Sequence, residues 1–216
     1  MRRRGALLAL VLGALLATPA IAVTTRTSYT PTQIRAYHQS GAWARDVGRV
    51  YRSAQRSLRR QLDRRGAPRR PAVVLDIDET SLSNYPCLDA VDFDLSGVAT
   101  CVTQGRSADI PAARRFVAAA QKRHVTVFFI TAAPEGLEAS RRANLRKVGY
   151  HGRFTVIGRP ASDTASSVVP YKSGERRKIE RRGYRILVNV GDQRSDLRGG
   201  HARARFKLPN RIYVTA

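Results

Sequence analysis

The chain has 216 residues and a formal net charge of +23 at pH 7, with no internal repeat and no low-complexity segment. The absence of a repeat excludes a repeat architecture. Beyond the N-terminal stretch, no segment is long and apolar enough to span a membrane.

The basic charge by itself is typical of proteins that bind nucleic acid or another anionic polymer. However, 34 of the 39 basic residues are arginine, and they are spread over the whole length rather than gathered in one aromatic-rich patch. This distribution favours a solvated, arginine-rich surface, and no specific nucleic-acid partner is expected. An anionic-polymer binder is kept as the alternative.

The N-terminus has the features of an export signal. Arg2, Arg3 and Arg4 precede an apolar stretch over residues 6–16, and Ala20-Ile21-Ala22 follows the small-x-small rule for cleavage. We therefore expect a signal peptide over residues 1–22 and one mature domain over 23–216, located outside the cytoplasm (secreted or periplasmic). An uncleaved membrane anchor is the alternative.

Export makes the two cysteines informative. Cys87 and Cys101 are the only cysteines, and an even count in an oxidising compartment predicts one disulfide. Two free, buried thiols are the alternative. A zinc site is not expected, because no second pair of Cys or His has the spacing of zinc ligands.

The first elements in chain order are helical. Apolar residues recur at three- and four-residue steps from Thr30 to about Arg65, where Gly41 can divide the pattern into two helices. A Gly- and Pro-rich turn at 66–71 then leads into the short apolar run 72–75, which is typical of a strand buried on both faces. Residues 81–109 lack clear periodicity and are predicted to form a loop-rich, cap-like insertion.

From Pro111 onwards, helical and strand patterns alternate. Helices are predicted over 111–124, from Pro134 to about 149, over 173–182 and, as a single turn, over 195–197; strands are predicted over 125–130, 154–157, 186–190 and 204–208. This alternation predicts an α/β fold with a doubly wound parallel sheet.

An unusual acidic stretch follows the first of these strands. Asp76 and Asp78 are two residues apart, so their side chains point roughly the same way, and Thr80 follows. Two carboxylates at the end of a buried strand repel each other, which implies a cation or a shared proton. A metal-dependent phosphoryl-transfer site is one explanation, and a solvated acidic loop is the other.

Other predicted strand ends supply further polar side chains. Thr131 ends the strand predicted over 125–130, and Asp192 and Asp196 follow the strand predicted over 186–190. Lys172 is expected in the loop before the helix that precedes this second strand. In open α/β sheets, ligands bind at the carboxyl ends of the strands. Together these residues predict a pocket for a phosphate and Mg²⁺, which prefers a few hard oxygen ligands.

These residues, in this order, resemble the four motifs of the haloacid dehalogenase (HAD) superfamily. The flanking segments 75–84, 129–131 and 191–197 are similar to those of its secreted acid phosphatases of class B/C type (subfamily IIIB), which are akin to plant vegetative storage proteins. The resemblance implies a HAD-like Rossmannoid fold, Mg²⁺ as cofactor, and hydrolysis of small phosphomonoesters.

The resemblance also implies a role for each residue. Asp76 would be the nucleophile that forms an aspartyl-phosphate, and Asp78 would be the general acid and then the base. The carboxylates of Asp76 and Asp192, with the backbone carbonyl of Asp78, would hold Mg²⁺. Thr131 and Lys172 would bind the phosphoryl oxygens. Asp196 would support the metal or orient Lys172.

One departure from the family pattern affects activity. Relatives commonly have an arginine two residues after the threonine of the second motif, whereas this chain has Ala133. Phosphate binding is then weaker, or another arginine replaces the missing one. A catalytically weak storage or phosphate-binding relative is the corresponding alternative. Glu79 is expected to be structural, and Asn84 to support the loop after the first motif.

Overall fold

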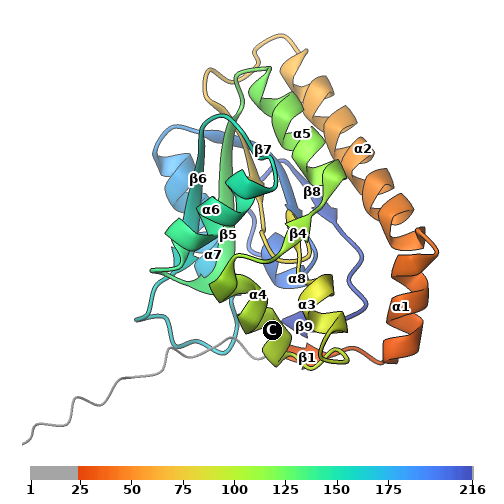
Figure 1. The fold of residues 1–216 in the computed structure, drawn as a ribbon. Coiled ribbons are helices and arrows are strands. Elements are labelled where there is room, and N and C mark those ends of the chain that lie inside the picture. Colours follow the sequence, from red (N-terminus) through yellow and green to blue (C-terminus); the bar gives the residue numbers. More distant parts are fainter. Residues whose placement is uncertain (1–23, 216) are drawn as a thin grey trace, which may run out of the picture.

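The computed structural model describes residues 24–215 and contains a five-stranded sheet in which all neighbours pair in parallel. The order across the sheet is β6-β5-β2-β7-β8 (Figure 1). The strands are β2 (Pro71–Leu75), β5 (Thr126–Pro134), β6 (Phe154–Arg159), β7 (Arg185–Gly191) and β8 (Ala204–Lys207). The predicted α/β fold with a parallel sheet is therefore confirmed. The expected signal segment, 1–22, lies outside the described residues.

Helices cover both faces of the sheet, because alternate residues of the buried strands point to opposite sides. On one face, Val73 and Leu75 pack in a core with α2 (Ala42–Leu62) and α5 (Pro111–Gln121). Leu145 of α6 (Glu138–Lys147) joins the same core. On the other face, Ala72 and Val74 pack against α7 (Val169–Arg181). The sheet is thus doubly wound.

The predicted division of the first helical segment is confirmed. Helix α1 (Pro31–Gln39) ends shortly before Gly41, whose φ of 71° lies in the left-handed region, and α2 begins at the next residue. Thr30 caps α1: its hydroxyl accepts a hydrogen bond from the Gln33 amide, and the Gln33 side chain accepts one from the Thr30 amide.

The insertion is more helical than predicted. It contains β3 (Leu82–Ser83), α3 (Tyr85–Asp89), α4 (Ser96–Gln104) and β4 (Ala108–Asp109), where β3 and β4 pair antiparallel. The elements are too short for their periodicity to be recognised in the sequence. The predicted disulfide is present: Cys87 of α3 and Cys101 of α4 are bonded, with their Cα atoms 5.8 Å apart.

Two predicted boundaries are wrong. The helix expected from Pro134 begins only at Glu138, because β5 continues past Thr131 to Pro134, which pairs with Arg159 of β6. Helix α7 begins at Val169 rather than at Ser173, with Pro170 in its first turn. Lys172 therefore lies on a helix, not in a loop.

The two ends of the described chain pair with each other, which the sequence did not predict. Strands β1 (Thr24–Arg26) and β9 (Tyr213–Thr215) form a small antiparallel sheet. Figure 1 shows it close to the insertion, below the parallel sheet. Within residues 24–215, no helix has the length and apolar character needed to cross a membrane.

Candidate active site

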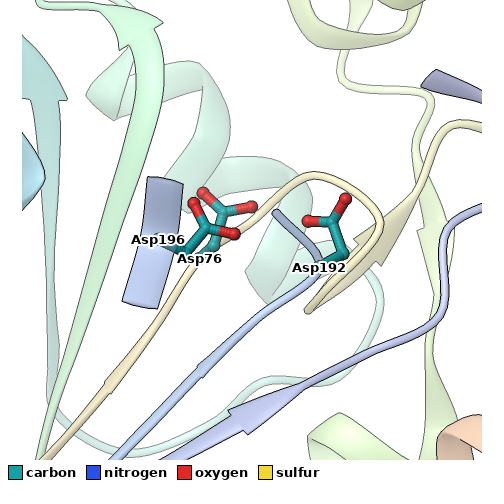
Figure 2. A group of neighbouring side chains, drawn as sticks. All are labelled: Asp76, Asp192 and Asp196. Carbon is teal, nitrogen blue, oxygen red and sulfur yellow. The ribbon is translucent and has the colours of Figure 1, made fainter. Parts of the chain in front are cut away.

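The predicted acidic residues meet at the carboxyl ends of the two central strands. Asp76 directly follows β2, and Asp192 directly follows its neighbour β7. Asp196 belongs to α8 (Arg194–Leu197), the helical turn after β7. Figure 2 shows the carboxylates of Asp76 and Asp196 side by side, with Asp192 at the end of β7. Each of the three offers an oxygen within 4.8 Å of the other two.

Lys172 bridges two of these carboxylates from α7. Its Nζ lies 2.6 Å from Oδ1 of Asp76 and 2.5 Å from Oδ1 of Asp196. Burial opposes the charge of Lys172, but the carboxylates of Asp196 and Asp76 outweigh burial and raise the lysine's pKa above its usual value. Lys172 is thus held as a buried cation.

The carboxyl group of Asp76 is strongly perturbed. Burial raises the pKa of Asp76 well above its usual value; Lys172 opposes this effect, and the charges of Asp196 and Asp192 add to it. The negatively charged form is therefore disfavoured unless a further cation approaches.

Asp192 is held by three hydrogen bonds. It accepts them from the side chains of Thr80 (2.9 Å), Gln193 (2.5 Å) and Asn210 (2.8 Å). Its pKa is nevertheless raised to about 6, first by burial and then by the charge of Asp196. The donors fix the orientation of the carboxylate without neutralising it.

The donor set fits a hard divalent cation. Three buried carboxyl groups face one lysine, so their negative charge exceeds the positive charge by two once all three are ionised, and carboxylate oxygens are the ligands that Mg²⁺ prefers. The local packing is close as well: a Cβ on Gly191 would lie 2.3 Å from the Cβ of Asp196. Glycine at this position lets Asp196 approach the end of β7.

Asp78 lies in a second, differently composed group of side chains. Its Oδ1 accepts hydrogen bonds from Nη2 of Arg141 (2.5 Å) and Nδ2 of Asn84 (2.8 Å). Its Oδ2 lies 3.4 Å from the hydroxyl of Thr131. Thr131 thus lies beside Asp78 and outside the three-carboxylate cluster. The supporting position expected for Asn84 is confirmed.

Arg141 is the site residue that the sequence did not identify. It lies on α6, its side chain is completely buried, and its Nη1 is 3.4 Å from the hydroxyl of Ser107. The expectation of a solvated arginine surface is wrong for this residue and for the buried Arg159 and Arg176. Among 34 arginines, no local pattern distinguishes Arg141; only its distance from Asp78 in the folded chain does.

Glu79 is structural, as expected. Its carboxylate accepts hydrogen bonds from the Asn84 amide (2.6 Å) and the Ser83 hydroxyl (3.1 Å), and its backbone adopts a φ of 51°. Burial raises its pKa to about 8. These bonds fix the sharp turn after Asp78 and connect it to the insertion.

A cavity of about 620 Å³ opens onto these residues. Its lining includes Asp76, Asp78, Lys172 and Asp192, together with Ala133, the residue that departs from the family pattern. The size lies within the usual range for small-molecule sites. Side chains of α4 in the insertion and of the end of β5 also contribute to its walls.

Comparison with known proteins places the chain in a protein family that is consistent with this site. The family described as HAD superfamily, subfamily IIIB (acid phosphatase) matches residues 15–216, and the chain belongs to that family. It is 32% identical over 151 residues to acid phosphatase 1 of Solanum lycopersicum, covering 65% of this chain and 57% of that protein. It is 30% identical over 148 residues to the stem 28 kDa glycoprotein of Glycine max, covering 65% and 58%.

A solved structure shows the same fold. The class C acid phosphatase from Bacillus anthracis superposes with a TM-score of 0.67 at 18% identity, covering 83% of this chain and 82% of that one. The chain spans less than three fifths of the length of the two plant relatives. The fold and the family are thus established, whereas the activity of the whole protein is a matter for proposal.

Proposed function

We propose that this protein is an exported, Mg²⁺-dependent acid phosphatase that hydrolyses small phosphomonoesters through an aspartyl-phosphate. The observation that carries the proposal is the position of Asp76: its buried carboxylate faces the cavity beside Lys172 and Asp192. The disulfide between Cys87 and Cys101 supports export, because such bonds persist in oxidising compartments. We assign 23–216 to one mature domain with 81–109 as its cap.

Asp76 would attack phosphorus and form the aspartyl-phosphate. Lys172 would orient Asp76 before the attack and then balance the charge of the phosphoryl oxygens, since its ammonium lies 2.6 Å from the attacking carboxylate. Asp196 would keep this lysine in place from the other side. Its own backbone is fixed, because its carbonyl accepts hydrogen bonds from Arg176 (2.7 Å) and Asn189 (2.8 Å).

The metal would be held by the carboxylates of Asp76 and Asp192 and by the backbone carbonyl of Asp78. When bound, Mg²⁺ neutralises charge that develops on the phosphoryl group. The excess of two negative charges in the carboxylate cluster supports this assignment.

Asp78 would move the protons. It would first donate a proton to the departing alkoxide, then accept one from the water that splits the aspartyl-phosphate, releasing inorganic phosphate and restoring Asp76. Arg141 and Asn84 would hold the Asp78 carboxyl in place through its Oδ1. The Thr131 hydroxyl would bind a phosphoryl oxygen from its position 3.4 Å from Oδ2 of Asp78.

Hydrolysis of p-nitrophenyl phosphate tests the proposal. We expect turnover by the mature protein with Mg²⁺, loss of turnover in EDTA, and loss in Asp76→Asn. Asp63→Asn is the matched control, because Asp63 is an exposed acid whose partner is Arg123, far from the cavity. No turnover at any pH from acid to neutral, with Mg²⁺ present, would refute the enzyme.

One observation favours a second candidate, a catalytically weak storage or phosphate-binding relative. Ala133 lines the cavity where relatives commonly have an arginine. The buried guanidinium of Arg141 argues for the enzyme, because it brings a positive charge to the same group of residues from α6. The weak relative would bind phosphate but show no turnover in the assay above.

A further inference from the structure

Helix α4 presents an apolar face to the cavity. Leu95, at its N-terminal cap, and Val98, Ala99 and Val102 all line the cavity, and their spacing of three, four and seven residues places them on one side of the helix. Ala99 is exposed and accessible from the cavity, whereas Val98 is half-buried and also packs against the cluster around Ile34 and Leu88, and Val102 is buried.

The part of the cavity wall formed by the end of β5 is also apolar. Ala132, Ala133 and Pro134 at the end of β5 line the cavity, and Leu137 follows them. The cavity therefore has carboxylates and a lysine where phosphorus would react, and aliphatic side chains beyond them. Its volume of about 620 Å³ far exceeds what a phosphoryl group alone requires.

Beyond the carboxylates and Lys172, apolar side chains outnumber polar ones in this lining, although Ser96 and Thr103 of α4 are among the polar ones. Tyr213 is the one aromatic residue among the described lining residues. Tyr85 and Phe93, which could have stacked on an aromatic group, belong instead to a hydrophobic cluster around Ile34 and Leu88. The insertion thus contributes aliphatic surface and not stacking platforms.

Arg159, the arginine in the lining, is paired with a neighbouring acid. Its Nη2 bonds to Asp163 (3.0 Å) and to the carbonyl of Ala165. Its Nε and Nη1 are buried and have no hydrogen-bond partner among the described residues. The charge of Arg159 is thus balanced locally by Asp163.

The apolar wall is held in position before any ligand arrives. The disulfide joins α4 to α3, and α4 packs so closely on α3 that a Cβ on Gly97 would lie 3.0 Å from the Cys87 carbonyl oxygen. A rigid wall does not have to be ordered during binding, which favours affinity for an apolar group.

From these features we propose that the preferred substrates carry an apolar aliphatic leaving group, so that the enzyme converts a monoalkyl phosphate and water into an alkanol and inorganic phosphate. The alkyl chain lies along the α4 face while phosphorus faces Asp76. This inference rests on the proposed phosphatase function. It commits to an aliphatic alcohol, in contrast to a nucleoside or a sugar.

The test is a chain-length series measured below the micelle concentration of each ester. The steady-state kcat/KM is determined for ethyl, butyl, hexyl and octyl phosphate, beside p-nitrophenyl phosphate, a nucleoside 5′-monophosphate and a sugar phosphate. Burial of a methylene group is worth up to roughly fourfold in kcat/KM, and partial burial over four methylenes predicts an increase of about tenfold or more from butyl to octyl phosphate.

Variants of α4 locate the effect. Val98→Asn and Ala99→Asn place a polar amide on the wall without adding charge, and should reduce the octyl-to-butyl ratio to about threefold or less. Ala99 is exposed, so its replacement leaves the core intact. Thr100→Asn is the matched control: Thr100 lies on the same helix, is exposed and does not line the cavity, so the ratio should stay at the wild-type value.

The outcomes separate the two proposals. Two outcomes would overturn the aliphatic specificity while p-nitrophenyl phosphate is still hydrolysed, so that the phosphatase proposal stands. In the first, kcat/KM is the same across the alkyl series; in the second, a nucleotide or sugar phosphate is preferred over octyl phosphate. An unchanged ratio in both α4 variants overturns the aliphatic specificity too. Absence of turnover for every monoester overturns both proposals.

Discussion

The two groups of charges in the site are balanced in opposite ways. In the first group, the carboxyl groups of Asp76, Asp192 and Asp196 face one cation, Lys172, so two negative charges remain unbalanced when all three are ionised. In the second group, Asp78 faces the buried guanidinium of Arg141, and the pair is neutral. Asp76 of the first group and Asp78 of the second are only two residues apart along the chain.

The difference shows how one strand end can carry two kinds of chemistry. A buried excess of negative charge is unfavourable in the protein alone and creates affinity for a divalent cation. A neutral, hydrogen-bonded pair is stable without a metal and holds its carboxyl group in one position for proton transfer. Substitutions in the two groups should therefore change stability in opposite directions.

The largest effect is expected from Arg141→Met. The substitution leaves the Asp78 carboxylate without its cationic partner, which should lower the free energy of unfolding by about 3 kcal/mol. It should also lower kcat by roughly 100-fold, because the carboxyl group to which we assign proton transfer is no longer held in place. Urea unfolding and steady-state kinetics, including the pH profile of kcat, measure both effects.

Two further variants make this prediction specific. Arg141→Lys keeps the charge and should restore part of kcat. Arg142→Met removes the exposed neighbouring arginine on α6, whose Nη1 bonds to the Phe154 carbonyl, and should leave kcat near the wild-type value. An Arg141→Met protein with wild-type kcat would show that Asp78 does not depend on this arginine.

The second effect is expected from removing the disulfide, which lies in the insertion and outside both charge groups. Closing a loop of this length, in which the cysteines are 14 positions apart in sequence, contributes about 3 kcal/mol in the chain-entropy model. A Cys87→Ser, Cys101→Ser double variant should lose this amount equally in the wild-type and Asp76→Asn backgrounds if the disulfide and the carboxylates are independent, because the effects of independent sites add. A loss that differs between backgrounds by more than about 0.5 kcal/mol would mean that the insertion is coupled to the carboxylates.

The sequence was sufficient for the sheet and for the first charge group. Strands β2 and β7 are short apolar runs that end in acids, and parallel strands bring their carboxyl ends to one edge, so Asp76 and Asp192 could be placed together from pattern alone. Lys172 was found as a candidate but assigned to a loop, because the start of α7 at Val169 carries no periodic signal.

The second charge group and the insertion could not be predicted in the same way. Arg141 lies 63 residues after Asp78, on a helix whose other arginines are mostly exposed, so its burial depends on how α6 packs near the insertion. The apolar face of α4 has helical spacing over only nine residues, too few to be distinguished from a loop. Long-range packing determines both the burial of Arg141 and the position of the α4 face, and the local sequence pattern carries no information about such packing.

A third effect is expected from adding metal. Mg²⁺ that binds only the folded protein should raise its free energy of unfolding by about 2.7 kcal/mol at 100 times its dissociation constant. Asp192→Asn should abolish most of this gain, whereas Asp63→Asn should retain it. Thermal unfolding with Mg²⁺ and with EDTA measures the difference, and an equal gain in the Asp192→Asn protein would place the metal elsewhere.

The smallest effect has the opposite sign to that of Arg141→Met. In EDTA, at a pH where all three carboxyl groups are ionised, Asp76→Asn should raise the free energy of unfolding by about 1 kcal/mol, because it removes one of three mutually repelling buried charges while Oδ1 can still accept the Lys172 hydrogen bond. With Mg²⁺ the advantage should disappear, since the wild-type carboxylate then ligates the cation. If Asp76→Asn lowers stability in EDTA as Arg141→Met does, the lysine balances the first group after all, and the excess charge that argues for a metal is absent. A gain in EDTA together with lost turnover would mean that the nucleophile is kept at the expense of the fold's own stability.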